Sequence, residues 1–224
     1  MKRHSVAVFL VCSMALFSVI PGSSVCASEM QPVAAANSIS ENEAKLEVYL
    51  KALFLQCLER QRIVEVKTLA APEDSAEGMA ENMDEAMIGL SETLDELENV
   101  FKVYYGQEDG GQISRLLQQY IYLSEDYSDA VREHNDRNSI IFDMHDKADE
   151  ISDFMDLLSR SWEKSGLRNV LKQYADLSAE EIEMKNQSLG KPDPDLYSKT
   201  SDKSAEIAGI FSAGIARQFP DKFR

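Results

Sequence analysis

The sequence predicts an all-α protein, an antiparallel up-and-down helical bundle with a bent or broken long third helix. Three observations lead to this prediction. Apolar residues recur at alternating spacings of four and three residues over most of the chain. Runs of alternating β-branched residues, which are typical of strands, are absent from the sequence. Pro and Gly, of which the chain has 6 and 10, gather at the few points that separate the periodic segments.

The first helix is expected to begin after Ser38 or Ser40, because Ser40 followed by Glu43 is a capping-box pattern. It is expected to end before Pro72, which cannot continue a helix. Arg60 interrupts the apolar stripe of this helix. The stripe consists of Leu46, Leu50, Leu53, Cys57 and Val64.

A second helix is predicted from about Ser75, with an unbroken apolar seam from Met83 to Tyr104. Gly106 is expected to end it, and Gly110 and Gly111 to complete the turn.

The third periodic segment spans residues 116–158. At a rise of about 1.5 Å per residue it would exceed about 60 Å, so we expect it to bend or break. Residues 134–139 are polar and rich in weak helix formers, which makes them the expected break, and Ser139 is the expected cap of the restart.

The sequence of the last part of the chain predicts three shorter helices. A short amphipathic helix is expected over 167–174, and a capping box at Ser178 is expected to open another helix as far as Leu189. A final helix is predicted from Asp195 to Gln218, terminated by Pro220.

The first 27 residues show the three parts of a secretory signal peptide. Lys2 and Arg3 precede an uncharged apolar run over 6–20, and small residues then lead to an expected cleavage after Ala27. We therefore expect an exported protein, periplasmic or extracellular, with a signal peptide over 1–27. A flexible lead over 28–38 and a single helical-bundle domain over 39–224 are expected to follow.

Two alternatives to a cleaved signal stay open. The apolar run of about 15 residues falls short of the ~20 that span a bilayer, but an uncleaved anchor is one alternative. Lipidation of Cys26 is the other. After cleavage Cys57 would be the remaining cysteine of three, so the fold is expected to hold together without an internal disulfide.

The charge of the chain limits its partners. The formal charge is −16; cleavage after Ala27 would keep all 39 acidic residues and 21 of the 23 basic ones, which gives −18. Such a surface repels phosphates and anionic lipids, so we expect no nucleic acid and no membrane contact beyond the export signal.

Several motifs in the C-terminal half resemble those of an uncharacterised family of small bacterial helical proteins. They are the run from Lys147 to Phe154, the Tyr174–Ser178 turn, and the ending Gly-Ile-x-x-Gln-Phe-Pro-x-Lys-Phe at 214–223. The resemblance covers most of 45–223 and implies a four-helix-bundle-like fold without an established activity.

The chain departs from that family at three positions. Cys57, Tyr120 and Tyr174 stand where family members carry histidines, so any metal or polar site of the family is expected to be lost here. Arg60 breaks an apolar stripe, where it is expected either to pair with a buried carboxylate, to reach solvent at the bundle edge, or to line a pocket for an anion. Our candidate ligand pocket therefore consists of Cys57, Arg60 and Tyr120.

The candidate metal ligands are His134, His145 and Asp149. His145 and Asp149 are four residues apart and would share a helix face. The interpretation that we favour is a polar hinge in which these His and Asp side chains are solvated. Neither the Glu-x-x-His pair of di-iron bundles nor the Cys-x-x-Cys-His of covalent haem occurs in the sequence, and we expect no cofactor.

No catalytic motif emerges from the sequence. It lacks the Gly-x-Ser-x-Gly elbow and phosphate-binding loops, and Cys57 lies on an apolar stripe, where burial is expected. We therefore expect a protein that is not an enzyme but a non-catalytic binding or interaction module, with an unknown protein or small-molecule partner. The alternative is a bundle that binds a small ligand or a metal as a sensor or carrier. The oligomeric state stays open.

Overall fold

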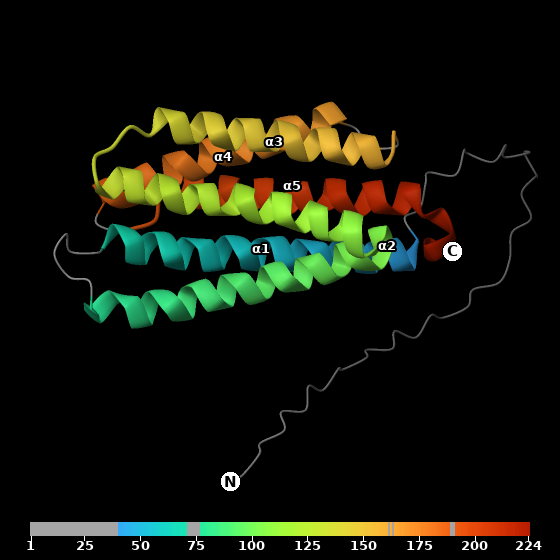
Figure 1. The fold of residues 1–224 in the computed structure, drawn as a ribbon, viewed down its shortest axis with the longest axis horizontal. Helices are drawn as coiled ribbons and strands as arrows, with labels where there is room; N and C mark the ends of the chain where they lie inside the picture. Colours follow the sequence, from blue (N-terminus) through green and yellow to red (C-terminus); the bar gives the residue numbers. More distant parts are fainter. Residues whose placement is uncertain (1–39, 71–76, 161, 163, 189–190) are drawn as a thin grey trace, which may run out of the picture. The chain divides into compact units, whose positions relative to one another are not determined.

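The structure, a computed structural model, describes residues 40–70, 77–160, 162, 164–188 and 191–224. Within these residues it consists of α-helices and one short 3-10 helix, without strands, which confirms the all-α prediction (Figure 1). The elements are α1 (Glu41–Leu69), α2 (Glu77–Arg132), α3 (Asn138–Leu158), α4 (Lys164–Gln187), α5 (Pro194–Gln218) and η1 (Pro220–Phe223).

The expected signal peptide over 1–27 and the lead over 28–38 lie outside the described residues. The compact unit that contains all the helices spans Ile39–Arg224. None of the helices in this described part is both long enough and apolar enough to cross a bilayer.

The helices pack into a bundle around one main hydrophobic core. α1 contacts α2 and α5, α4 contacts α3 and α5, and α3 contacts α2, so the helices close a ring. Phe211 of α5 lies in the centre of the core, with its ring centroid 5.3 to 5.7 Å from those of Phe54, Phe101 and Trp162. Burial of large side chains such as these, at about 25 cal/mol per Å² of apolar surface, stabilises the fold.

α1 begins where the sequence predicts. The Ser40 hydroxyl accepts a hydrogen bond from the Glu43 backbone N–H at 3.2 Å, which caps the helix. All five residues of the predicted stripe are buried, Val64 included, and Arg60 interrupts the stripe as expected. The polar residues Gln61 and Glu65 are buried beside the stripe as well, which the sequence did not indicate.

α2 consists of two helical arms. Gly106 has φ 81° and ψ 179°, a backbone conformation that glycine adopts readily, and the chain folds back there (Figure 1). We call residues 77–105 the first arm and residues 107–132 the second arm. The prediction that Gly106 ends a helix is thus confirmed. The prediction that Gly110 and Gly111 complete the turn is wrong, because both are helical residues of the second arm.

The predicted break of the long third segment is confirmed. α2 ends at Arg132 and α3 begins at Asn138, and His134 between them has the positive φ of 58°. The expected cap is wrong. Asp136, not Ser139, accepts the hydrogen bond from the Asn138 N–H, at 3.0 Å.

α4 corrects the prediction of two short helices in this region. It runs without interruption through Ser178, whose side chain is buried in the middle of the helix and caps nothing. Its neighbours decide this, because α4 packs along both α3 and α5 and buries residues at helical spacing over its whole length. α5 agrees with prediction to within one residue, with Asp193 as its N-cap and Pro194 at its first position.

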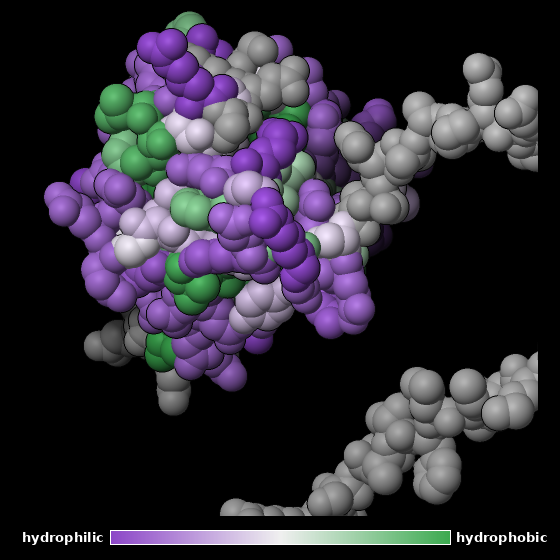
Figure 2. Space-filling view, turned by 90° about the vertical axis from the view of Figure 1, so that its right-hand side faces the viewer, coloured by the Kyte–Doolittle hydropathy of each residue, from purple (hydrophilic) through white to green (hydrophobic). Residues whose placement is uncertain are grey.

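The C-terminal segment, residues 214–223, closes one end of the bundle. Phe223 of η1 is buried and stacks on Tyr104, with ring centroids 5.9 Å apart. Gln218 accepts hydrogen bonds from the Tyr105 hydroxyl and the Trp162 indole N–H. Figure 2 shows this end of the molecule, where hydrophilic residues dominate and hydrophobic ones lie in small separate patches.

Candidate functional site

Two of the three predicted pocket residues lie together in the core. Cys57 of α1 and Tyr120 of the second arm of α2 line an enclosed void, together with Tyr174 of α4. Cys57, Tyr120 and Tyr174, which we expect to stand at histidine positions of the family that the C-terminal motifs resemble, therefore meet at one place. The void has a volume of about 20 Å³. It has room for about one water molecule and not for a metabolite.

The two tyrosine hydroxyls beside this void are already hydrogen-bonded, and its thiol is not activated. The Tyr120 hydroxyl donates to the Leu171 carbonyl at 2.5 Å, and the Tyr174 hydroxyl donates to Gln61 Oε1 at 3.3 Å. Burial, with a contribution from Glu96, raises the pKa of Cys57 to about 12. A thiol with this pKa stays protonated at neutral pH and is not a nucleophile.

Arg60, the third predicted pocket residue, does not reach the void. Its half-buried guanidinium lies over Gly89 on the first arm of α2. Its neighbour Arg62 is the arginine that pairs with a buried carboxylate. Arg62 is 5% exposed and donates from Nε and Nη2 to both oxygens of Glu181, at 2.8 and 2.9 Å.

Arg62 belongs to a buried charge network that joins α1 to α4. We use this name for Arg62, Glu65, Glu181 and Lys185. Lys185 contacts Glu65 at 2.6 Å and Glu181 at 3.0 Å. All four residues are at most 5% exposed. Two cations and two anions balance each other in this network, so each charge has the partner that its burial requires.

Neutral polar groups extend the buried charge network to two further helices. Gln61 donates to Glu65 at 3.0 Å and to Ser124 of the second arm of α2 at 2.5 Å. On the other side, the Arg62 guanidinium lies 3.5 Å from the ring centroid of Tyr197 on α5. The network thus fastens α1 to the second arm of α2, to α4 and to α5.

The two carboxylates of the network have opposite pKa shifts. Burial tends to raise the pKa of Glu181, but its hydrogen bond to Arg62 and the charges of Lys185 and Arg62 outweigh burial and lower it. Burial raises the pKa of Glu65 in spite of the nearby Lys185. This arrangement is that of a structural ion-pair network rather than a catalytic dyad, because each carboxylate already has a cation in contact.

Glu125, on the second arm of α2, is near this network but has no counterion among the described residues. Its Oε1 is buried and has no hydrogen-bond partner among the described residues. Burial, followed by the charges of Asp126, Asp129 and Glu65, raises the pKa of Glu125 to about 7.

Glu125→Gln is expected to stabilise the protein above pH 7 and to have no effect near pH 4. The folded-state pKa of this acid is raised, so the folded state binds more protons than the unfolded state between pH 4.5 and 7. Wild-type stability therefore falls as the pH rises through that range. Because Glu125 is partly exposed, we expect a gain of about 1–2 kcal/mol at pH 8.

Urea unfolding at pH 8 and pH 4 measures this gain. Glu108→Gln, an exposed acid on the same helix, is the control and should change neither value. A stabilisation of Glu125→Gln that is equal at both pH values would show that the ionised carboxylate is not its cause.

The structure does not bring the predicted metal ligands together. His145 pairs with Asp176 at 2.9 Å, and Asp149 pairs with Arg168 and Lys172. His134 is exposed in the turn between α2 and α3. Among the described residues no group of three or more His, Cys, Asp or Glu side chains is placed to hold a metal ion.

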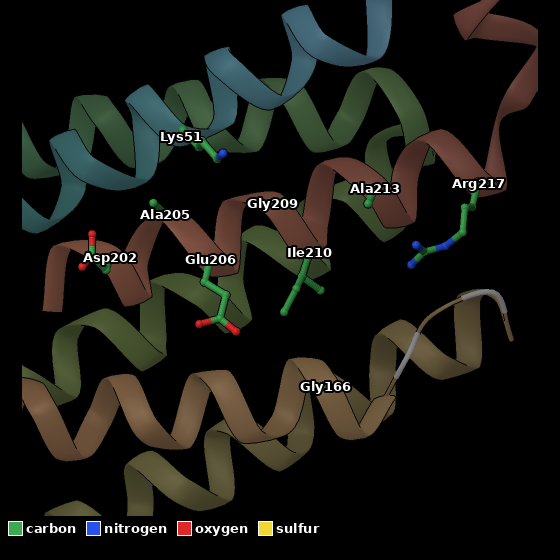
Figure 3. A pocket seen from close by; sticks show the side chains of 9 residues that line it. All are labelled: Lys51, Gly166, Asp202, Ala205, Glu206, Gly209, Ile210, Ala213 and Arg217. Atoms are coloured by element: carbon green, nitrogen blue, oxygen red, sulfur yellow. The ribbon is translucent and has the colours of Figure 1, made fainter. Parts of the chain in front are cut away.

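An open groove along the outer face of α5 is the more promising site. It lies between α1 and α4 and has a volume of about 490 Å³ (Figure 3). Small residues form its floor, and one Ile side chain lies among them. The small residues are Gly166 of α4 and Ala205, Gly209 and Ala213 of α5. A Cβ added to Gly209 would meet no atom within 4 Å, so the groove is open at its centre.

Charged residues form the rim of this groove, which we call the α5 groove. Figure 3 shows Asp202 and Arg217 at its two ends, with Glu206 between them and Lys51 across from them on α1. Lys51 is already paired with Glu47, and Glu206 with Lys203. Asp202 and Arg217 are exposed and have no ion-pair partner among the described residues.

A second open groove, of about 510 Å³, lies between α2 and α3. Three acids, Asp143, Asp146 and Glu150, line it. Lys147 spans this groove, with its ammonium bonded to Gln119 at 3.0 Å and to Glu150 at 2.5 Å. Lys147, the cation among the lining residues, thus already has partners within the chain, whereas Asp202 and Arg217 of the α5 groove have no ion-pair partner among the described residues.

Sequence reasoning missed both the α5 groove and the buried charge network. The signal for the groove was available in the small residues Ala205, Gly209 and Ala213, which recur every four residues. The signal for the network was weaker, since Glu181 and Lys185 form an ordinary i, i+4 pair that usually lies in solvent.

The fold and the groove together describe a helical bundle with an open surface site. Comparisons of this chain with family models, with curated proteins and with solved structures find no match. Membership of the family that its C-terminal motifs resemble stays a prediction.

Proposed function

We propose that this chain is an exported, non-catalytic interaction module that binds a helical segment of a partner protein in the α5 groove. The observation that carries the proposal is the groove itself, about 490 Å³ and open, with a floor of glycine and alanine. Ile210 is the one larger apolar side chain in this lining, and the small residues beside it let the backbone of a second helix approach closely. The unpaired Asp202 and Arg217 at its ends supply charges for orienting that helix.

Other classes of function have less support. A small ligand inside the bundle would need far more room than the void of about 20 Å³ beside Cys57. A nucleophilic mechanism would need a thiol with a low pKa, and burial raises the pKa of Cys57 to about 12.

Export is supported by the signal-peptide pattern of residues 1–27. N-terminal sequencing of the exported protein should find Ser28 as its first residue.

Site-specific photo-crosslinking in cells tests the α5 groove. A photoreactive amino acid at Glu206, an exposed residue on the rim, leaves the floor of the groove open and should form a covalent adduct with the bound partner. Glu180 on α4 is the matched control, because it is also an exposed glutamate but lies outside the groove. We expect an adduct of defined mass from position 206 and none from position 180.

The proposal fails if neither position yields an adduct, or if both yield the same adducts. Gly209→Trp, which fills the groove, should remove the adduct formed from the photoreactive residue at position 206. Its circular dichroism spectrum and unfolding curve should match the wild type, because the new side chain enters solvent-filled space.

A further inference from the structure

We infer that the helix that occupies the α5 groove is α5 of a second copy of this chain, packed antiparallel across a two-fold axis near Gly209. The inference rests on the proposed function and names its partner. It requires that the surface be complementary to itself, since a two-fold contact brings the same patch of both copies together. The positions of its charges, its small residues and its open space meet this requirement.

The free charges of the α5 groove are placed symmetrically about Gly209. Asp202 lies seven residues before Gly209 and Arg217 eight residues after it, which is about 10 and about 12 Å along the helix. When two such helices pack antiparallel with their Gly209 residues adjacent, Asp202 of each copy lies at the level of Arg217 of the other. Both ends of the contact then carry an ion pair of opposite charges.

Asp202 and Arg217 are also the charged rim residues without an ion-pair partner among the described residues. Lys51 and Glu206 on the same rim have partners within the chain, whereas Asp202 and Arg217 have none among the described residues. A partner with a different charge arrangement would leave one of them facing like charge or an apolar surface. A second copy satisfies both without any change in the monomer.

The floor of the groove has the same symmetry. Ala205 and Ala213 lie one helical turn on either side of Gly209, so each alanine meets the other across the two-fold axis. Small residues at the crossing point allow an interaxial distance near ~8 Å, the short end of the usual range. The groove has the open space for this approach, since nothing lies within 4 Å of a Cβ at Gly209.

Charge reversal tests this geometry. We expect Asp202→Arg and Arg217→Asp each to weaken self-association at least about tenfold, because each places like charges together at both ends of the contact. The double variant Asp202→Arg/Arg217→Asp restores both pairs and should dimerise like the wild type. A mixture of the two single variants should form a heterodimer, because all of its end contacts are again opposite in charge. Light scattering of the exported protein and of the mixtures measures these states.

Glu180→Arg, an exposed charge reversal on α4 outside the groove, is the control and should leave the dimer unchanged. The inference is overturned if the wild type stays monomeric up to about 1 mM, a concentration that populates even weak interfaces. It is also overturned if the double variant and the mixture stay as weak as the single variants.

The crosslinking at position 206 separates this inference from the proposed function. An adduct of twice the mass of the chain supports the dimer. An adduct of another mass, together with a monomeric wild type, would reject the dimer and retain the α5 groove as a site for a different protein. Absence of any adduct would reject both.

Discussion

Replacing Arg62 with Met is expected to lower the free energy of unfolding by about 3–5 kcal/mol. The change leaves Glu181 buried without its bidentate partner, with Lys185 as its one remaining cation. It also removes the guanidinium from the Tyr197 ring. Methionine fills part of the space, but it cannot replace hydrogen bonds to a buried carboxylate.

Arg60→Met is the matched control for this experiment. Arg60 lies two residues away on the same helix, is half-buried and packs over Gly89, so its replacement should cost less than about 1 kcal/mol. Urea unfolding of both variants at pH 7, followed by circular dichroism, makes the comparison. Equal losses would mean that the buried charge network contributes no more than an arginine at the edge of the bundle.

The second large effect is expected at Gly110, where an alanine should destabilise the protein by about 3 kcal/mol. A Cβ at this position would lie 2.6 Å from the backbone nitrogen of Lys102 and 2.8 Å from the Phe101 carbonyl carbon. Both contacts are with backbone of the first arm of α2. Since backbone cannot rotate away as a side chain does, the two arms would have to separate.

Gly111→Ala should have the opposite sign. A Cβ there meets only the ends of two flexible side chains, at 3.8 and 3.9 Å, and alanine favours a helix over glycine by about 0.5–1 kcal/mol. Thermal or urea unfolding of the two single variants gives a direct comparison of adjacent glycines. The close approach of the two arms would be disproved if both alanines stabilised the protein.

The helices themselves were predictable because their apolar residues keep a strict spacing. The cap at Ser40 and the break before Asn138 follow from short-range chemistry, and both lie where that chemistry indicates. The failures lie where tertiary contacts override a local signal. Ser178 resembles a cap in sequence, but packing of α4 on both sides keeps the helix continuous through it.

The candidate site was harder to predict than the fold. Arg60 and Arg62 are two positions apart on α1 and therefore point in different directions. Arg60 lies over the first arm of α2, whereas Arg62 is buried against α4. The buried ion-pair partners of Arg62 and Glu65 lie more than a hundred residues away in sequence, on α4. An open groove is a property of neighbouring surfaces, so the spacing of Ala205, Gly209 and Ala213 along one helix could not reveal it alone.

The chain reversal at Gly106 prevents the two arms of α2 from sliding along each other. One non-helical residue joins them, so neither arm can slide along the other by a turn without unwinding the backbone. The buried charge network sets the level of α4 against α1 in a different way, because a shift of one turn would separate Glu65 from Lys185. The axial register of the helices is therefore fixed at two places. The short connection at Gly106 fixes the two arms of α2 relative to each other, and the buried charge network fixes α4 relative to α1.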